Sequence, residues 1–433
     1  MGKKNSNLFG DYTFPIKIQS NVLNGIKKPS GVPFRTTIFG EEEKNIEILS
    51  PAGSAESLNF AVKYGADAVY LSLNNFTMRS GPENFTTAGL AEAVKFCHEN
   101  GVRVYLICNT LPRNWEVSLL DEFISVAKSC GVDALIVSDI GIFDRVKHKF
   151  DVHISTQFGV TNYQTANTLH KMGAKRVVLA RELSLTEIAE IRAKTSPELE
   201  LEAFVHGAMC VAFSGRCLLS AYLTGRNANL GDCAQPCRWG YNLTNTDRSV
   251  ELYEGEGYSY ILNSKDLCMI EHIGELAEAG ITSFKIEGRA KSFYYTAVIT
   301  NAYKLAAECY KQGSDLPEWV LQEVFKVSHR EYCTGFYFGE PEQVYADGGY
   351  VRTSDVIAIT DRCSDGRMFL TQRNRFFEGD EVEFLSPGAK PRLIKIEDLR
   401  NEAFEHIEQA NHAMEQVSIA TDIEEQGLLR ITR

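Results

Sequence analysis

The sequence predicts an α/β fold, with a TIM-like (β/α)8 barrel followed by a small C-terminal β-barrel domain. From residue 46 onward one unit recurs, in which a helix ends at a glycine and a β-branched run follows. About eight such runs alternate with helices, which is the pattern of a (β/α) barrel. After about residue 339, short alternating runs are separated by turn residues, which is typical of a small β domain. These patterns divide the 433 residues into an N-terminal arm at 1–45, a barrel at 46–338 and a C-terminal domain at 339–433.

The first unit of the barrel shows the pattern in full. A strand at 46–49 is followed by a turn, and a helix begins after Ser54, whose hydroxyl can cap it. The helix runs to Tyr64, before Gly65, a common helix terminator. An open doubly wound sheet has the same alternation, but no Gly-x-Gly-x-x-Gly follows the first strand, so the barrel is preferred. Further strands are expected at 67–71, 102–107, 132–137, 151–156, 174–179, 199–205 and 281–286.

The two ends of the chain differ from the barrel. Residues 1–45 are irregular, with scattered proline and glycine, and an extended arm or a partly disordered tail is expected there. The C-terminal domain is expected to contain strands at 356–360, 368–371, 381–385 and 393–396.

Composition narrows the possible functions. Apolar residues make up 44% of the chain and charged residues 24%, as in an ordinary globular protein. The net charge of −12 argues against non-specific coating of nucleic acid, so an RNA substrate would need a local basic patch. No apolar run is long enough for a membrane span, and the first residues have no apolar segment typical of a secretory signal. A cytoplasmic protein without a membrane partner is expected.

Functional groups of a (β/α) barrel lie where its strands end. Each polar residue at these ends also has a structural interpretation: Glu182 could begin a helix, Asp139 could cap one, and Lys285 could be a solvated charge. Their convergence on one rim favours a functional site. The residues at the expected strand ends are Ser50, Gly53, Asn109, Asp139, Gln157, Arg181, Glu182, His206, Lys285, Glu287 and Arg289.

The eleven cysteines fall into two groups. Six stand singly in apolar or helical surroundings, and five crowd between residues 210 and 268. In a reducing compartment such crowding indicates metal binding or catalysis before disulfides. Four of the five follow one predicted strand, with intervals of six, fifteen and three residues, which match neither two zinc knuckles nor the tight ferredoxin spacing. Four thiolates suit a soft metal, and the spacing leaves a 4Fe–4S cluster and Zn both open for Cys210, Cys217, Cys233 and Cys237.

Long motifs in the chain resemble peptidase family U32, the collagenase-like peptidases. Residues 202–220 are similar to the signature of that family, and 263–267 and 285–295 are similar to its two later blocks. Residues 47–53 with 64–70 resemble its opening, so that the similarity runs from about residue 46 to the end. The resemblance implies a barrel with a 4Fe–4S cluster on the four thiols.

Within the family, the chain is most similar to members that act in tRNA hydroxylation. The similarity lies in the combination of residues 181–184, 205–208 and 233–239. It implies an iron–sulfur protein required for prephenate-dependent hydroxylation of the tRNA wobble uridine to 5-hydroxyuridine. Other relatives act in ribosomal RNA hydroxylation and in oxygen-independent ubiquinone hydroxylation.

This resemblance suggests roles for the rim residues. His206 and Glu182 are expected to be the catalytic proton-transfer pair, because histidine titrates near neutrality. Cys268 could replace Cys237 as the fourth ligand, as in the ubiquinone-type relatives, but Cys237 is favoured because it shares one loop with the other thiols. The residues expected to bind a dicarboxylate such as prephenate, or RNA phosphate, are Arg181, Lys265, Lys285, Glu287 and Arg289.

Two other classes of function remain open. The family name asserts a peptidase, which needs an activated nucleophile or a metal-bound water. Neither a Gly-x-Ser-x-Gly elbow nor a His-Glu-x-x-His motif is present, and the thiols are better explained by a metal. A non-catalytic RNA-binding adaptor is the third class, which would bind tRNA while its deletion leaves tRNA modification unchanged.

Overall fold

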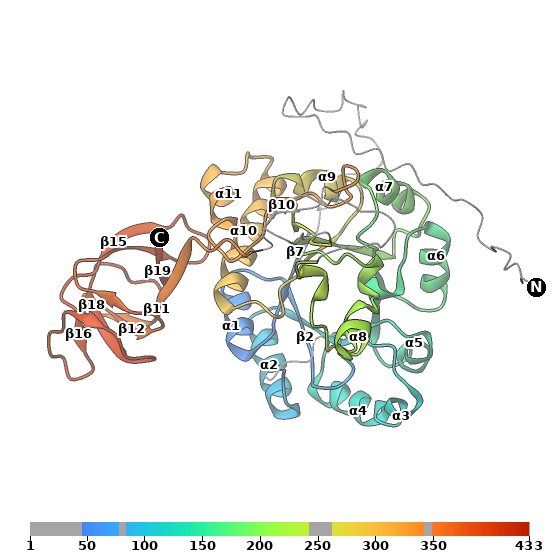
Figure 1. Ribbon diagram of the computed structural model, residues 1–433, viewed down its shortest axis with the longest axis horizontal. Coiled ribbons are helices and arrows are strands. Elements are labelled where there is room, and N and C mark those ends of the chain that lie inside the picture. Colours follow the sequence, from blue (N-terminus) through green and yellow to red (C-terminus); the bar gives the residue numbers. More distant parts are fainter. Residues whose placement is uncertain (1–45, 78–83, 242–261, 342–348, 433) are drawn as a thin grey trace, which may run out of the picture. The chain divides into compact units, whose positions relative to one another are not determined.

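The computed structural model describes residues 46–77, 84–241, 262–341 and 349–432 (Figure 1). The predicted N-terminal arm, residues 1–45, lies outside these ranges. None of the helices in these ranges combines the length and the apolar character needed to cross a membrane.

Eight parallel strands form a closed barrel, as predicted. The seven strands from β1 to β7 pair in chain order, and β9 closes the barrel by pairing with both β7 and β1. Two short strands, β8 (Asp266–Cys268) and β10 (Tyr332–Cys333), extend the sheet beyond β7. The barrel strands are β1 (Glu47–Pro51), β2 (Ala68–Leu71), β3 (Arg103–Cys108), β4 (Ala134–Val137), β5 (Asp151–Ile154), β6 (Arg176–Val178), β7 (Glu200–Ala208) and β9 (Ser283–Ile286).

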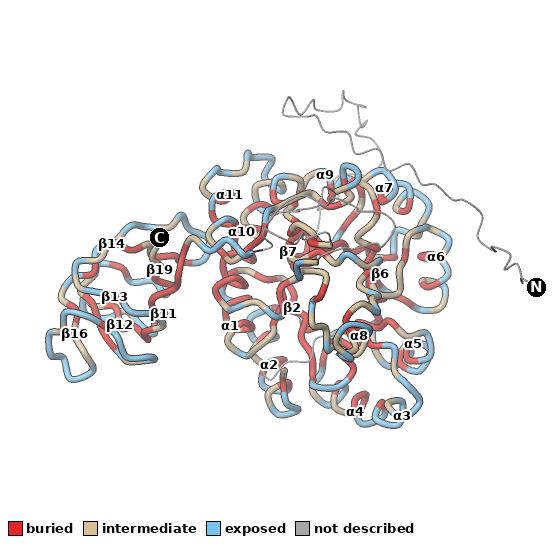
Figure 2. Tube along the Cα trace, in the orientation of Figure 1, coloured by how far each residue is buried: buried red, intermediate tan, exposed pale blue. Residues whose placement is uncertain are grey.

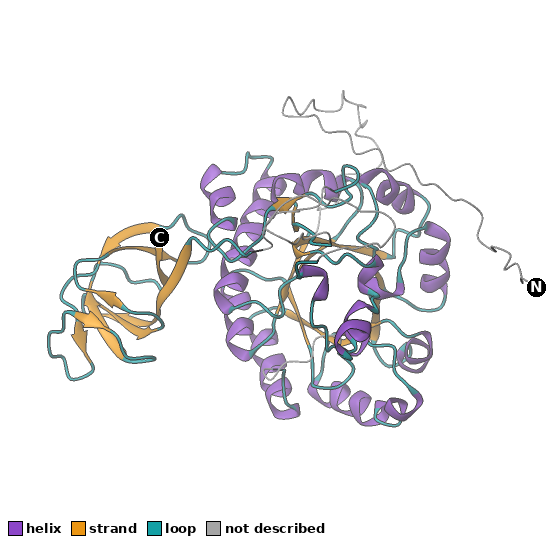
Figure 3. Cartoon of the chain, in the orientation of Figure 1, coloured by secondary structure: helices purple, strands orange, loops and turns teal. Residues whose placement is uncertain are grey.

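Helices surround the barrel (Figure 3), and the first of them begins at Ser54 as the sequence predicts. The Ser54 side chain accepts a hydrogen bond from the backbone N–H of Ser57, and Gly131 ends a helix in the left-handed conformation. The helices are α1 (Ala55–Lys63), α2 (Thr87–Glu99), α3 (Asn114–Val117), α4 (Leu120–Cys130), α5 (Ile140–Val146), α6 (Tyr163–Lys171), α7 (Leu185–Ala193), α8 (Leu219–Thr224), α9 (Ile273–Glu278), α10 (Phe293–Gln312) and α11 (Glu318–Val324).

The buried residues of the barrel lie both inside it and under the helices (Figure 2). The inside also holds a network of charges. The Arg176 guanidinium donates to Glu47 at 2.6 Å and to Glu202 at 3.0 Å, and Lys285 Nζ donates to Glu202 at 2.7 Å. Burial would raise the pKa of Glu47, but the Arg176 charge outweighs it and lowers that pKa. Through Glu202, this network holds the Lys285 side chain in place inside the barrel.

The C-terminal domain is an antiparallel sheet curved into a half-barrel, with a separate two-stranded sheet. Its seven strands lie in the order β15-β14-β19-β11-β12-β18-β16 around a buried apolar core. The strands are β11 (Ser354–Ser364), β12 (Arg367–Gln372), β13 (Phe376–Phe377), β14 (Glu381–Leu385), β15 (Arg392–Lys395), β16 (Arg400–Asn401), β17 (Gln409–Ala410), β18 (Gln416–Ala420) and β19 (Leu428–Thr432).

Candidate functional site

A cavity of about 140 Å³ lies at the carboxyl ends of the barrel strands. Its floor includes Tyr70, Ile107 and Phe204, whose side chains come from β2, β3 and β7. The segment that follows β7, residues 209–240, lines the opposite side and is called the cysteine loop below; it contains α8, which lies over the barrel opening in Figure 1. The polar and thiol side chains on the cavity wall include Asn109, Gln157, Arg181, Cys210, Cys217, Cys233, Cys237, Lys285, Glu287 and Arg289.

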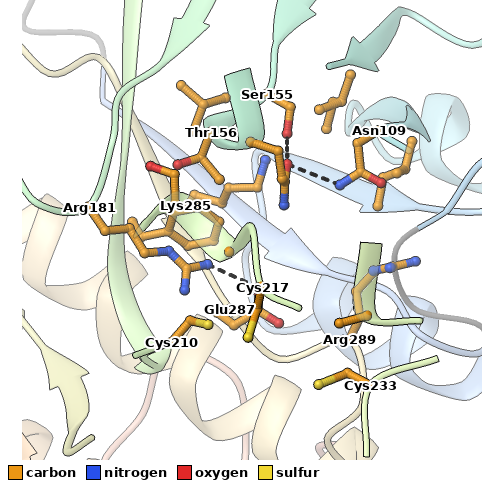
Figure 4. A pocket seen from close by; sticks show the side chains of 18 of the residues that line it. Asn109, Ser155, Thr156, Arg181, Cys210, Cys217, Cys233, Lys285, Glu287 and Arg289 are labelled. Atoms are coloured by element: carbon orange, nitrogen blue, oxygen red, sulfur yellow. Dashed lines mark hydrogen bonds and ion pairs between the residues drawn. The ribbon is translucent and has the colours of Figure 1, made fainter. Parts of the chain in front are cut away.

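The four loop thiols all line this cavity, and Figure 4 shows three of them turned toward the same space. Backbone N–H groups two residues further on donate to the sulfurs of Cys210, Cys217 and Cys233 at 3.3–3.4 Å. Burial raises the pKa of Cys237 to about 11 and also raises the pKa of Cys210. Among the described residues, no three Cys, His, Asp or Glu side chains form a group that could hold a single metal ion.

Cys268 lies elsewhere. It is on β8, opposite His206 on β7, and it does not line the cavity. Burial raises its pKa to about 11, while a hydrogen bond with Tyr303 acts in the opposite direction. The structure therefore gathers Cys237, rather than Cys268, with the other three loop thiols.

Two arginines beside the thiols have buried N–H groups without a hydrogen-bond acceptor. Arg181 donates through Nη1 to the carbonyl oxygen of Ala208 at 3.1 Å and stacks on Phe204 at 3.8 Å, but its Nε has no partner. Arg238 donates through Nη2 to Met209 at 3.5 Å, and its Nε and Nη1 have no partner. Unpaired buried donors are costly, and Arg181 lines the cavity, so its guanidinium group indicates an acceptor that binds there.

Three predicted substrate-binding residues besides Arg181 line the same cavity. Lys285 lies above the Tyr70 ring at 4.6 Å and is held by Glu202. It is buried, so the interpretation as a solvated charge does not apply. Glu287 pairs with Arg181 at 3.5 Å, and Arg289 donates to Thr77 at 2.9 Å and to Ser72.

Close backbone contacts position the turn that carries Glu287 and Arg289. A Cβ at Gly53 would lie 1.9 Å from the carbonyl oxygen of Arg289, and one at Gly207 would lie 2.4 Å from that of Glu287. The Tyr295 hydroxyl donates to the same Glu287 carbonyl oxygen at 2.8 Å. Glycine at both positions therefore allows this turn to approach the thiols and the arginines.

The structure does not bring His206 and Glu182 together, and each has other partners. His206 is buried beneath α10, within 3.3 Å of the Tyr303 hydroxyl through Nδ1 and of the Tyr332 hydroxyl through Nε2. Burial lowers its pKa to about 3, which keeps the ring neutral at physiological pH. Glu182 accepts hydrogen bonds from the backbone N–H and the hydroxyl of Ser214, at 2.7 and 3.1 Å. Glu182 thus orders the cysteine loop.

The remaining rim residues have mostly structural partners. Asp139 caps α5, as its structural interpretation expected, and Ser50 is hydrogen-bonded to Thr300. Lys265 pairs with Glu331 at 3.3 Å and lines a second cavity behind Cys210, not the first. Arg238 was not assigned a role by the sequence, although it directly follows Cys237 in a motif that carries the family resemblance.

The comparisons with known proteins agree with this architecture. The model of peptidase family U32 matches residues 53–347, and that of the family's C-terminal domain matches residues 352–430. The chain is 36% identical to tRNA hydroxylation protein P1 of Bacillus subtilis, over 88% of this chain and 92% of that protein.

Two further relatives carry different names. The chain is 31% identical to a collagenase of Porphyromonas gingivalis, over 83% of this chain and 91% of that protein. It is 39% identical to the 23S rRNA 5-hydroxycytidine synthase of Escherichia coli, over 60% of this chain and 39% of that protein. The two matched domains and the identity across most of the chain show that this protein belongs to peptidase family U32.

Proposed function

We propose that this protein is an iron–sulfur RNA hydroxylase that takes part in converting the tRNA wobble uridine to 5-hydroxyuridine, with prephenate as a small-molecule partner. The observation that carries the proposal is that four thiols line one cavity at the barrel mouth together with Arg181, Lys285 and Arg289, and that the Arg181 Nε–H has no acceptor. The choice of RNA hydroxylation is supported by relatives that are named for tRNA hydroxylation and for 5-hydroxycytidine synthesis.

The residues present fit a 4Fe–4S cluster held by Cys210, Cys217, Cys233 and Cys237. A single Zn, the other occupant that four thiolates suit, would need all four sulfurs within about 2.3 Å of one point. Four thiols spread around one cavity are better suited to a centre with several metal atoms. The backbone N–H groups on the sulfurs are the hydrogen bonds that tune such clusters. When bound, the cluster would supply one-electron chemistry.

The cavity wall has the charge expected of a dicarboxylate site. Apart from the cysteines, the residues of ionisable type on this wall are Arg181, Lys285 and Arg289 against Glu287 alone. The guanidinium groups can bind carboxylates in a bidentate manner. Lys285 adds a positive charge, and its hydrogen bond to Glu202 holds that charge in place. These residues would bind and orient a small dianion such as prephenate beside the thiols.

A peptidase is less well supported, although one relative is named a collagenase. Among the described residues, no histidine is hydrogen-bonded to a serine hydroxyl or a cysteine thiol, so no nucleophile–histidine pair is present. Such a pair is the usual means of activating a nucleophile.

The proposed function is tested by deleting the gene that encodes this protein. A strain that lacks it should lose wobble 5-hydroxyuridine derivatives from digested tRNA, measured by mass spectrometry, and the plasmid-borne parent protein should restore them. Arg289→Ala should restore them poorly, because a lost charge at an anion site typically costs about 2–5 kcal/mol when its partner is buried. Unchanged nucleosides in a host without a paralogue or an oxygen-dependent bypass would refute the proposal. Peptide cleavage by metal-free protein would favour the peptidase instead.

A further inference from the structure

The wall of the cavity at the barrel mouth is divided by charge. Apart from the cysteines, its residues of ionisable type follow β6 or belong to β9 and the turn after it: Arg181, Lys285, Glu287 and Arg289. The part of the wall that comes from β3, β4, β5 and the turns after them is uncharged and consists of Ile107, Asn109, Ile136, Ser155, Thr156 and Gln157. The proposed dianion needs only the charged side, which leaves the uncharged side without a ligand.

The side-chain amide of Gln157 on the uncharged side is held in one orientation. Gln157 lies in the short turn Thr156–Phe158 that follows β5. Its Oε1 accepts hydrogen bonds from Asn109 Nδ2 at 3.3 Å and from the Ser155 hydroxyl, and both bonds are drawn in Figure 4. Because the oxygen faces these two donors, the Nε2 amino group must point away from them.

The Gln157 Nε2 group faces the cysteine loop and has no acceptor there. A Cβ at Gly215, a residue of that loop, would lie 3.9 Å from Nε2, and both residues line the cavity. Among the residues that the structure describes, none accepts a hydrogen bond from Nε2. Gln157 therefore offers a fixed, uncharged donor to a ligand in the cavity.

The chemistry of this side matches an uncharged ring that carries a carbonyl group. A carboxylate placed against it would lose its water without gaining a cation. Uracil is uncharged and has the carbonyl oxygen O4 beside C5, the carbon that becomes hydroxylated. Cytosine has an amino group, which is a donor, in place of O4. The Nε2 group can donate to O4, but it would meet a second donor in cytosine.

We infer that the uncharged side of the cavity is the subsite for the uracil base of the RNA, and that Gln157 distinguishes uridine from cytidine. The inference rests on the proposed function and deepens it, because it places the base that is modified. Enzymes that modify a base in RNA or DNA take it out of its stack and read its hydrogen-bonding edge in a pocket. Asn109 and Ser155 are positioning residues, since they act through the Gln157 oxygen.

The test is the affinity of anaerobically purified, iron-loaded protein for two anticodon stem–loop RNAs that differ only in uridine or cytidine at the wobble position. Fluorescence anisotropy measures both affinities. The parent protein should bind the cytidine RNA roughly 5- to 150-fold more weakly, which is the usual effect of leaving a buried donor unpaired. The ratio of the two affinities is the readout, because phosphate contacts are the same in both RNAs.

Two substitutions of Gln157 should change this ratio in different ways. Gln157→Ala should bind the uridine RNA roughly 2- to 10-fold more weakly, the effect of losing one neutral hydrogen bond, and should lose most of its preference. Gln157→Glu keeps the oxygen that Asn109 and Ser155 contact but replaces Nε2 by an acceptor. It should therefore prefer the cytidine RNA, because a carboxylate accepts a hydrogen bond from the cytosine amino group.

Gln164→Ala is the matched control, because Gln164 is exposed on α6, after the same strand, and does not line the cavity. It should keep the preference of the parent protein. Prephenate affinity, measured by calorimetry, should stay unchanged in Gln157→Ala and should fall in Arg289→Ala. If both Gln157 variants lose iron, Asn109→Asp decides instead. Its carboxylate should turn the amide round, so that Oε1 faces the cavity and the preference reverses.

Equal affinity of the parent protein for the two RNAs would overturn the inference, as would an undiminished preference in Gln157→Ala or, where iron is lost, in Asn109→Asp. An undiminished preference together with weaker prephenate binding would assign Gln157 to the dianion. If deletion of the gene removes 5-hydroxyuridine while the parent protein shows no preference, this inference fails and the proposed function stands. Unchanged nucleosides after the deletion would refute the proposed function, whatever the two RNA affinities are.

Discussion

At the scale of single residues, the shared cavity, and not the pKa, distinguishes the thiols that lie together from a thiol that is only near them in sequence. Burial raises the pKa of both Cys237 and Cys268 to about 11, and both residues are partly exposed. Only Cys237 faces the cavity with Cys210, Cys217 and Cys233. A metal displaces the proton of each thiol that it binds, so a raised pKa does not prevent a thiol from becoming a ligand. The shared cavity therefore decides which thiols are the ligands.

Substitution of these cysteines should distinguish a ligand set that includes Cys237 from one that includes Cys268. Cys210→Ala and Cys237→Ser should abolish bound iron, whereas Cys268→Ser should keep the iron, the sulfide and the visible absorbance of the parent protein. The measurement is iron, sulfide and zinc analysis after anaerobic purification. Iron retained in Cys237→Ser and lost in Cys268→Ser would establish the ubiquinone-type ligand set instead.

His206 should make the stability of the protein depend on pH. Its pKa is about 3 in the folded protein because of burial and about 6.5 when unfolded, so the unfolded state binds more protons between these values. Stability due to this side chain is complete above pH 6.5 and falls as the pH falls. From pH 7 to pH 5 the loss should be about 2 kcal/mol.

Urea unfolding of the parent protein and of His206→Gln at pH 7 and pH 5 measures this loss. The variant should lose less stability than the parent over the same interval, by about the amount given. His153, whose pKa burial also lowers, stays in both proteins and cancels in the comparison. An identical pH dependence in the two proteins would mean that His206 is accessible to protons in the folded state.

At the scale of elements, the turn after β9 depends on a glycine in β7. Gly207 has a φ of +105°, and its missing Cβ leaves room for the carbonyl oxygen of Glu287. Gly101 also has a positive φ, +70°, but nothing lies within 4 Å of its would-be Cβ. Comparison of alanine substitutions at the two positions therefore separates the cost of backbone strain from the cost of a clash between β7 and the turn after β9.

Gly207→Ala should lower the free energy of unfolding by about 2–4 kcal/mol, the sum of backbone strain and overpacking. It should also weaken restoration of tRNA modification, because the turn carries Glu287 and Arg289. Gly101→Ala should cost only about 1 kcal/mol and restore modification fully. Chemical denaturation and nucleoside analysis measure both effects, and equal costs for the two variants would contradict this role of Gly207.

At the scale of the whole molecule, a buried ion pair joins the C-terminal sheet to the barrel helices. Arg430 on β19 donates twice to Glu323 on α11 at 2.6 Å, and once to Glu383 at 2.8 Å. Burial opposes its charge, but the hydrogen bonds with Glu323 outweigh burial and raise the pKa of Arg430. The guanidinium is fully buried, so its loss would leave the buried Glu323 carboxylate with Lys326, at 3.3 Å, as its remaining ion-pair partner among the described residues.

Arg430→Met should therefore destabilise the protein by about 3–5 kcal/mol, as expected when one partner of a buried pair is removed. Combining it with Glu323→Leu should recover much of that loss, because no uncompensated charge remains. Thermal and urea unfolding of the two single variants and the double variant form a complete cycle. If the double variant loses as much free energy of unfolding as the two single variants together, the pair does not couple the domains energetically.

The sequence by itself determined the barrel, its strand ends and the U32 family. Strand and helix periodicity and the glycine terminators are local signals, and all eight predicted barrel strands are present. Only the tertiary structure decided which rim residues meet. Strict alternation along β7 would turn His206 inward with Phe204, but the register of β7 against β9 shifts between these two residues. That shift places His206 under α10, because one extra residue in a strand reverses the face of every side chain after it.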